Sequence, residues 1–303
     1  MENFVLIIAF LLIGMGLRRL PRFPKETAQV LNLFVIYVSL PALILLKVPQ
    51  LTFSRDILAP VIMPWAMLAV SAAIILVLAR LCRWSREITG SLLLLVPLGN
   101  TSFLGIPMVR AFFDEAGIPY AVLYDQLGSF LALATYGTVV LALYGNDRST
   151  ERPQIRLIIE KVVTFPPFLT LILALVLQGL TLPAPAVALF NSLAATLVPV
   201  VMIAVGYQLT PRLRPEVLQP LLIGLSIKLL VAPLLALLFC KALGIDIASL
   251  AVRVAILEAG MPPMVSAGAL AIMAGLAPEF TAAMIGVGIL LSFLTLPLLF
   301  QFL

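Results

Sequence analysis

Three ionisable side chains lie deep inside long apolar stretches of the chain: Asp125, Lys228 and Glu258. A charge at the centre of a bilayer costs about 2.5–3.5 kcal/mol on the insertion scale, so each of these residues is a functional candidate. Glu258 precedes a Gly-Met-Pro-Pro run, where a helix ends and leaves carbonyl oxygens free. Its carboxylate either binds Na⁺ beside those oxygens, takes up a proton, or forms a buried pair with Lys228 that only fixes helix packing.

Asp125 and Gln126 lie in another apolar stretch, directly after a tyrosine. Their side chains either complete an ion site with Glu258 and Asn100 or hydrogen-bond the broken backbone nearby. Lys228 is expected to compensate the charge of a buried carboxylate, which limits the cost of burial. Direct contact between its ammonium group and a bound anion is the alternative.

Two apolar segments are interrupted by helix-breaking residues, and they occupy matching places in the two halves of the chain. The first reads VPLGNTSFLGIPMV at residues 96–109, and the second reads LEAGMPPMVSAGAL at residues 257–270. Gly, Asn and Pro free backbone groups that lipid cannot satisfy, so such breaks persist at membrane depth only where protein or water covers them. A matched pair of breaks is the best sequence indication of a binding site in a secondary transporter.

The residues around the breaks define the predicted site. Pro107 and Pro263 suit the first turn of each resumed helix, so two helix N-termini with free N–H groups would face each other and favour a carboxylate anion. For the Asn-Thr-Ser run of the first break, turn and capping roles are the alternative to substrate binding. For Asn32 and Asn191, the alternative is hydrogen bonding between helices. The predicted substrate-binding residues are Asn100, Thr101, Ser102, Pro107, Met261, Pro262, Pro263, Asn32 and Asn191.

The composition places nearly the whole chain in a membrane. Of its 303 residues, 62% are apolar and 11% are charged, against about 25% charged residues in soluble domains. The N-terminus reads as a retained first transmembrane helix, because no cleavage site follows its apolar run. Two distant cysteines, no histidine and no nucleophile–base pair indicate no zinc centre, no other cofactor and no enzyme. The basic residues are dispersed, which argues against a nucleic-acid partner.

Breakers and charges divide the chain into ten predicted spans, since a transmembrane helix needs about 20 apolar residues. The spans lie at residues 3–17, 28–46, 57–80, 88–112, 117–144, 164–180, 184–207, 217–240, 248–274 and 279–302. Because each half holds an odd number of spans, the second half enters the membrane from the opposite side. The predicted fold is an all-α integral membrane protein with ten transmembrane helices in two inverted five-helix repeats, in which helices 4 and 9 are broken. The repeats are residues 1–145 and 164–303, joined by a cytoplasmic connector at 146–163.

Basic residues predict the orientation, because they concentrate in cytoplasmic loops. Thirteen lysines and arginines follow spans 1, 3, 5 and 7, whereas five lie on the other side. The richer side is taken as cytoplasmic, so both termini are predicted to lie outside. Within the spans, close helix packing is expected at Gly14, Gly16, Gly286 and Gly288.

Three motifs carry a family resemblance: LNLFVIYVSLP at 31–41, GNTSFLGIP at 99–107 and LYDQ at 123–126. Together they resemble the bacterial auxin efflux carrier family, which is related to the plant PIN-type auxin transporters. The likeness spans essentially the whole chain. It implies a fold shared with sodium–bile acid symporters, crossing helices 4 and 9 at the site, and homodimers. It also implies a scaffold of helices 1, 2, 6 and 7 and a mobile crossover domain of helices 3–5 and 8–10.

The resemblance implies organic anion substrates, such as malate- or malonate-like dicarboxylates in bacteria. Asn100 and Pro107 match the first crossover, and Pro262–Pro263 match the second. The run from Glu258 to Met261 resembles the sodium-binding stretch of bile acid symporters, but Pro262 replaces the glutamine that follows it there. One ligand of a second sodium site is therefore missing, and Na⁺ coupling, proton coupling and uniport all stay open.

The predicted function is secondary active transport of a small carboxylate across the bacterial plasma membrane by alternating access. The alternative is a cation–proton exchanger of the Na⁺/H⁺ antiporter type without an organic substrate. Two acids adjacent in sequence would favour the exchanger, but Asp125 and Glu258 are far apart along the chain.

Overall fold

The computed structural model describes residues 2–51, 55–145, 155–180, 182–209 and 217–303, with side chains from residue 4 onward. These residues form helices joined by short connections, and they include no β-strand. The predicted all-α class is therefore confirmed. Residues 146–154 of the predicted connector lie outside the described residues, as do four of the basic residues used to predict the orientation: Arg148, Arg152, Arg212 and Arg214.

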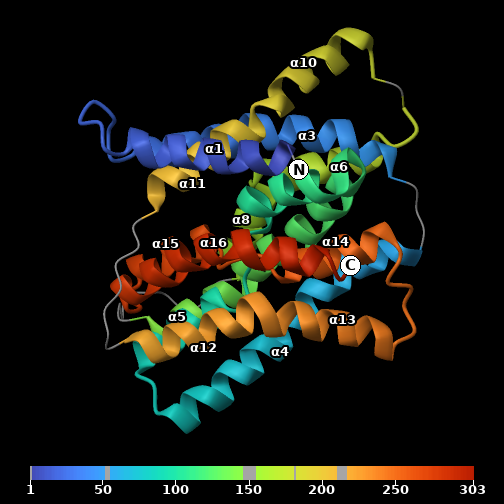
Figure 1. The fold of residues 1–303 in the computed structure, drawn as a ribbon. Helices are drawn as coiled ribbons and strands as arrows, with labels where there is room; N and C mark the ends of the chain where they lie inside the picture. Colours follow the sequence, from blue (N-terminus) through green and yellow to red (C-terminus); the bar gives the residue numbers. More distant parts are fainter. Residues whose placement is uncertain (1, 52–54, 146–154, 181, 210–216) are drawn as a thin grey trace. The chain divides into compact units, whose positions relative to one another are not determined.

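Coiled helices make up most of the described chain (Figure 1), and shorter π-helical and 3₁₀ turns lie between some of the α-helices. The α-helices are α1 (Glu2–Leu17), α2 (Thr27–Phe34), α3 (Leu40–Lys47), α4 (Leu58–Cys82), α5 (Arg86–Leu95), α6 (Ile106–Leu123), α7 (Thr138–Tyr144), α8 (Ile155–Val163), α9 (Pro166–Val176), α10 (Ala184–Ala195), α11 (Leu197–Gln208), α12 (Leu218–Ser226), α13 (Ala232–Ala242), α14 (Leu250–Ala259), α15 (Val265–Met273) and α16 (Pro278–Phe300). The π-helical turns are η1 (Val35–Ser39), η4 (Thr101–Gly105), η5 (Tyr124–Phe130), η6 (Leu133–Gly137) and η8 (Ile227–Val231). The 3₁₀ turns are η2 (Val48–Gln50) and η3 (Arg55–Ile57).

Six helical stretches of the described chain are long and apolar enough to cross a membrane, and a seventh is added if the bent pair α8–α9 forms one span. They are Thr27–Gln50, Arg55–Cys82, Thr101–Tyr144, Ala184–Gln208, Leu218–Ala242 and Pro278–Phe300. The other predicted spans correspond to shorter helices, such as α1 with 16 residues and the separate halves α14 and α15. Membrane-spanning helices are thus present, and the number ten stays a prediction.

The predicted boundary between spans 4 and 5, at residues 113–116, coincides with a kink between two helical segments. The helical stretch continues from Thr101 to Tyr144 and departs from helical geometry at Asp114, with φ 57° and ψ −160°. Such a backbone conformation is costly for a residue with a side chain. A single strained residue therefore redirects the chain here without a loop.

The chain divides into two compact units. Unit 1 comprises Met1–Ser54, Ser102–Val122 and Lys161–Leu209, and unit 2 comprises Arg55–Thr101, Leu123–Glu160 and Thr210–Leu303. The predicted roles of scaffold and mobile domain stay predictions.

Unit 1 is built on close pairs of helices. The helix α1 packs along α11 (Figure 1), and α3 packs against both α9 and α10. The hydroxyl groups of Ser39 and Thr196 form a hydrogen bond of 2.7 Å across this packing. Gly14 of α1 lies so close to α11 that an added Cβ would overlap the carbonyl oxygen of Ile203, and Gly206 of α11 lies equally close to Leu11. The expected close packing at Gly14 is confirmed.

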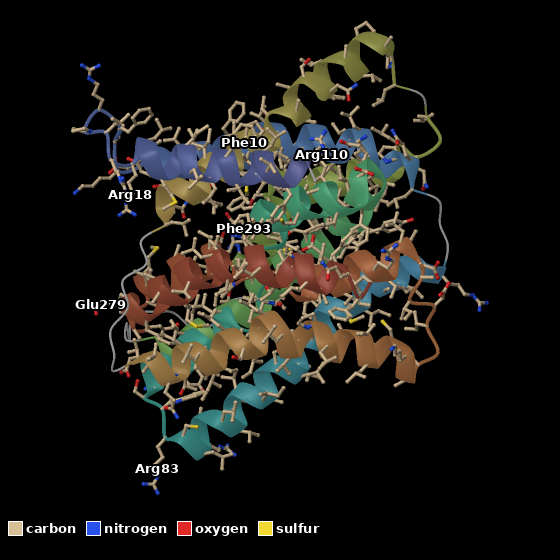
Figure 2. All side chains as sticks on the ribbon, in the orientation of Figure 1. Phe10, Arg18, Arg83, Arg110, Glu279 and Phe293 are labelled. Atoms are coloured by element: carbon tan, nitrogen blue, oxygen red, sulfur yellow. The ribbon has the colours of Figure 1, made fainter. Side chains whose placement is uncertain are left out.

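Unit 2 has two apolar clusters. The larger joins α5, α12, α15 and α16 through side chains such as Leu92, Leu225 and Phe280, and the smaller joins α4, α13 and α14 through Met63, Cys240 and Ile256. The helix α4 ends where Arg83 adopts a left-handed conformation with φ 53°, and its side chain extends from that end of the helix (Figure 2). Ser85 then caps α5 by accepting a hydrogen bond from the Ile88 amide. Tight packing thus holds α5 and α14, the two helices that lead into the breaks.

We predict that Gly14→Ala lowers the thermal midpoint of the detergent-solubilised protein, because the added methyl group would meet the backbone of α11. Overpacking of this kind costs about 1–3 kcal/mol. Gly16→Ala is the matched control, since no heavy atom lies within 4 Å of an added Cβ there. The expectation that Gly16 also permits close packing is wrong, because it faces away from α11. Equal thermal midpoints for the two variants in scanning fluorimetry would contradict this packing.

Candidate functional site

The two sequence breaks meet each other inside unit 2. The backbone forms an isolated antiparallel bridge between Gly99 and Pro263. The Asn100 amide donates to the Pro262 carbonyl at 2.8 Å, and the Met264 amide donates to the Leu98 carbonyl at 3.0 Å. Each break therefore satisfies backbone groups that the other has freed, as burial away from water requires.

The tandem prolines explain why the second break opens where it does. The helix α14 ends at Ala259, and the amides of Gly260 and Met261 close its last turn on Leu257 and Glu258. Pro262 and Pro263 have no amide to donate, so the helix cannot continue through them. It resumes as α15 at Val265, after Met264 in an extended conformation.

The structure differs from the expectation that Pro263 and Pro107 each lie in the first turn of a resumed helix. Pro263 was expected in the first turn of the resumed helix, but α15 starts two residues later and Pro263 lies in the bridge to Gly99. Pro107 is the second residue of α6, yet the helical backbone already begins with η4 at Thr101. The Pro107 side chain lines a cavity of about 390 Å³ in unit 1, together with Arg110 and Pro199.

Lys228 reaches the junction of the breaks from η8. Its side chain is 3% exposed, and its Nζ donates to the Ala259 carbonyl at 3.3 Å. A Cβ atom on Gly99 would lie 3.2 Å from the same Nζ. The ammonium group therefore touches the end of α14 on one side and the first break on the other.

Glu258 is fully buried in the last turn of α14. Its two carboxylate oxygens have no hydrogen-bond partner among the described residues. The carboxylate interacts electrostatically with Asp125 and Lys228, but the described residues form no Glu258–Lys228 ion pair within 4.0 Å. The direct salt bridge that the sequence left open is thus not formed, and the carboxylate keeps its capacity to accept hydrogen bonds.

Asp125 ties the first break to η5. It accepts a hydrogen bond of 2.5 Å from the Thr101 hydroxyl and one of 2.6 Å from the Gln126 amide. Hydrogen bonds to a charged acceptor are stronger than those between neutral groups. Because the Thr101 hydroxyl donates its hydrogen bond to Asp125, helix capping alone does not explain the role of Thr101.

Asn100 offers an unused donor at the same place. Its side chain is 2% exposed, and its Nδ2 atom has no hydrogen-bond partner among the described residues. Gln126 adds an unused acceptor, because its buried Oε1 atom has no hydrogen-bond partner in the described chain. A buried polar group without a partner costs about 1–3 kcal/mol, so these atoms are expected to meet a ligand or water.

The predicted residues fall into two groups. Unit 2 brings together Asn100, Thr101, Asp125, Gln126, Lys228, Glu258, Met261, Pro262 and Pro263. Ser102, Pro107, Asn32 and Asn191 belong to unit 1, where Asn191 is exposed and the buried Oδ1 of Asn32 finds no partner in the described chain. The role of this second group stays a prediction.

Sequence reasoning missed three contributors to the site: Gly99, the Ala259 carbonyl and Tyr124. Gly99 gives room to the Lys228 ammonium, and Tyr124 is a buried side chain that interacts electrostatically with Glu258. Tyr124 could have been found from its position beside Asp125 in an apolar stretch. The carbonyl could not, because every residue has one.

The site offers binding groups of both signs. The first amides of α15 have no partner within the helix, and together with the Asn100 side chain they form donors for an anion. The carboxylate of Glu258 and the carbonyl oxygen of Ala259 are acceptors for a cationic group.

Comparison with known proteins gives a consistent result. The model of the membrane transport protein family matches residues 1–300. An uncharacterized transporter of Methanothermobacter thermautotrophicus is 29% identical over 304 residues, which cover 98% of this chain and 96% of the relative. An uncharacterized transporter of Methanocaldococcus jannaschii is 29% identical over 221 residues, which cover 70% of each chain. The chain, with its several apolar helices long enough to span a membrane, thus belongs to the membrane transport protein family, the auxin efflux carrier-like family that its motifs resemble.

Proposed function

We propose that this membrane transport protein is a secondary transporter of a small organic anion, with the anion bound at the paired breaks. The observation that carries the proposal is the backbone pairing of Gly99–Asn100 with Pro262–Pro263 deep inside unit 2. Irregular backbone at membrane depth is typical of the substrate sites of secondary transporters.

The choice of a carboxylate rests on the donors at this place. The helix α15 begins immediately after the paired backbone, and its first amides carry the partial positive charge of a helix N-terminus. The Asn100 Nδ2 atom adds a buried donor without a partner in the described chain. A carboxylate has the charge and the acceptor oxygens to satisfy both.

The architecture that goes with this function is the one implied by the family: ten helices in two inverted repeats, with broken helices 4 and 9. Helix packing in unit 1 supports it. The predicted spans 1, 2, 6 and 7 contain α1, α3, α9 and α11, respectively. If an internal twofold axis relates span 1 to span 6 and span 2 to span 7, it also relates the α1–α11 contact to the α9–α3 contact. Both contacts are present. Alternating access would then move one part of the protein against the other around a fixed site.

The membrane setting of the proposal follows from the distribution of charge and from the family resemblance. We place the protein in a plasma membrane with both termini outside and the basic loops in the cytoplasm. The lipid bilayer and a second copy of the chain are its proposed partners.

A cation–proton exchanger is the second candidate, and one observation favours it. The buried carboxylates of Asp125 and Glu258, distant in sequence, interact electrostatically in the structure. An exchanger would acidify or alkalinise proteoliposomes when Na⁺ is added, in the absence of any organic anion. The anion carrier would show no such response.

We predict that Asn100→Ala abolishes malonate binding, measured by isothermal titration calorimetry on purified protein, because the buried amide donor is lost. Gln301→Ala truncates an exposed amide side chain directly after α16 and should leave the affinity unchanged. Both variants should elute as monodisperse species in size-exclusion chromatography. An Asn100→Ala protein with the wild-type affinity would refute the site assignment.

If Glu258 takes up a coupling ion, we also predict that Glu258→Gln removes the response of malonate uptake to an imposed Na⁺ or pH gradient, because a buried carboxylate needs a cationic partner and a neutral amide does not. Uptake of labelled malonate into proteoliposomes, with Na⁺ and pH gradients imposed separately, measures this.

Two outcomes would speak against the coupling role of Glu258. A Glu258→Gln protein that still concentrates malonate against its gradient would end that role. A purely structural role would instead make Glu258→Gln less stable, with Lys228→Met restoring stability in the double variant and the ion response retained.

A further inference from the structure

The ammonium group of Lys228 occupies the position that a coupling cation would need. It lies where the end of α14 meets the first break, 3.3 Å from the Ala259 carbonyl and 3.2 Å from the Cβ position of Gly99. In secondary transporters, carbonyl oxygens at the C-terminal ends of half-helices coordinate Na⁺. Here such a carbonyl oxygen accepts from the chain's own side chain.

A Na⁺ ion at the junction would compete with hydrogen bonds that the backbone carbonyls already accept. The carbonyl oxygens of Leu98, Ala259 and Pro262 at the junction each accept a hydrogen bond, from Met264, Lys228 and Asn100. Pro262 also stands where the resemblance implies a glutamine ligand. Glu258 would remain as the anionic ligand, with the positive charge of Lys228 close to it. The residues present therefore disagree with the sodium site that the family resemblance suggests.

The charges at the junction also favour the Lys228 ammonium group as the cation there. Glu258 is fully buried and needs a positive partner, and Lys228 is equally buried and needs a negative one. The carbonyl end of α14 adds its partial negative charge to the attraction for the ammonium group. Tyr124 and Asp125 also interact electrostatically with Glu258, and neither supplies a positive charge.

We infer that Lys228 is a tethered cation that replaces Na⁺ at the junction of the breaks, so that the carrier binds its organic anion without Na⁺. The inference rests on the proposed function and deepens it. Gly99 contributes to this arrangement, because any side chain at position 99 would crowd the Lys228 ammonium group. Removal of the lysine side chain should leave a space with an unpaired carboxylate and a free carbonyl oxygen, which small cations can fill.

The test compares malonate binding in NaCl and in choline chloride for wild type, Lys228→Ala and Lys228→Met. Wild type should bind equally in both salts. Lys228→Ala should lose at least about tenfold in affinity in choline, as expected for loss of a buried charge partner, and should regain it with Na⁺ or ethylammonium. Lys228→Met fills the space with an uncharged side chain and should stay weak in every salt. Lys241→Ala, at an exposed lysine on α13, is the matched control and should behave as wild type.

A second readout separates this inference from the proposed function. Without any organic anion, ethylammonium should raise the thermal midpoint of Lys228→Ala and leave those of wild type and Lys241→Ala unchanged. A carrier that binds no carboxylate in any salt but shows this stabilisation would refute the proposed function and support the tethered cation. Na⁺-dependent binding by wild type, or a folded Lys228→Ala protein that no cation stabilises, would overturn the inference.

Gly99→Ala keeps the test decisive if Lys228→Ala does not fold. The added methyl group would lie 3.2 Å from Nζ and displace the ammonium group by a few tenths of an ångström. Malonate affinity should fall in both salts, and Gly16→Ala should have no effect. Unchanged affinity in a folded Gly99→Ala protein would contradict the tethered cation.

Discussion

The structure depends on one constraint: backbone groups released at membrane depth must find partners within the protein. The breaks at Gly99–Asn100 and Pro262–Pro263 release amides and carbonyls that lipid cannot satisfy. The chain meets the constraint by pairing one break with the other, through a bridge and two flanking hydrogen bonds of 2.8 and 3.0 Å. Because this pairing consumes some of the freed groups and leaves others, it decides which donors and acceptors are available for a ligand.

The ionisable residues are arranged around this pairing. Asp125 is held by Thr101, the residue that follows the first break, and Lys228 is held by the carbonyl of Ala259, the residue that ends α14. Glu258 lies one residue earlier, with its carboxylate buried. Charges that would be expensive in lipid thus become tolerable because each faces an opposite charge or a dipole from the broken backbone. The same arrangement places a positive helix N-terminus and a fixed ammonium group near the proposed anion site.

Much of this could be predicted from the sequence, because the signals are local. Glycine, asparagine and proline inside apolar runs locate the breaks, and the cost of burying charge singles out Asp125, Lys228 and Glu258. The start of α15 at Val265 was not predicted, since the loss of two amides at the tandem prolines delays the helix beyond Pro263. The space beside Gly16 depends on how α1 is rotated about its axis against α11. The composition of the helix does not specify this rotation.

Other features depend on contacts that no local pattern specifies. The partner of Lys228 is a backbone carbonyl, and only the folded chain brings that carbonyl to the lysine. Similarly, the kink between the predicted spans 4 and 5 arises from the backbone angles of Asp114. Register and rotation between helices are set by packing across the whole unit, so they appear only in the structure.

The central claim is that an organic anion binds at the paired breaks, against the first turn of α15. Solid-state NMR on membrane-reconstituted protein tests it most directly, by measuring dipolar couplings between ¹³C-carboxylate malonate and ¹⁵N-labelled backbone amides. The account predicts carboxylate carbons within about 4 Å of the amide nitrogens at the start of α15, a separation set by N–H···O hydrogen bonds. Bound malonate that shows couplings to other amides and none to this turn would contradict it.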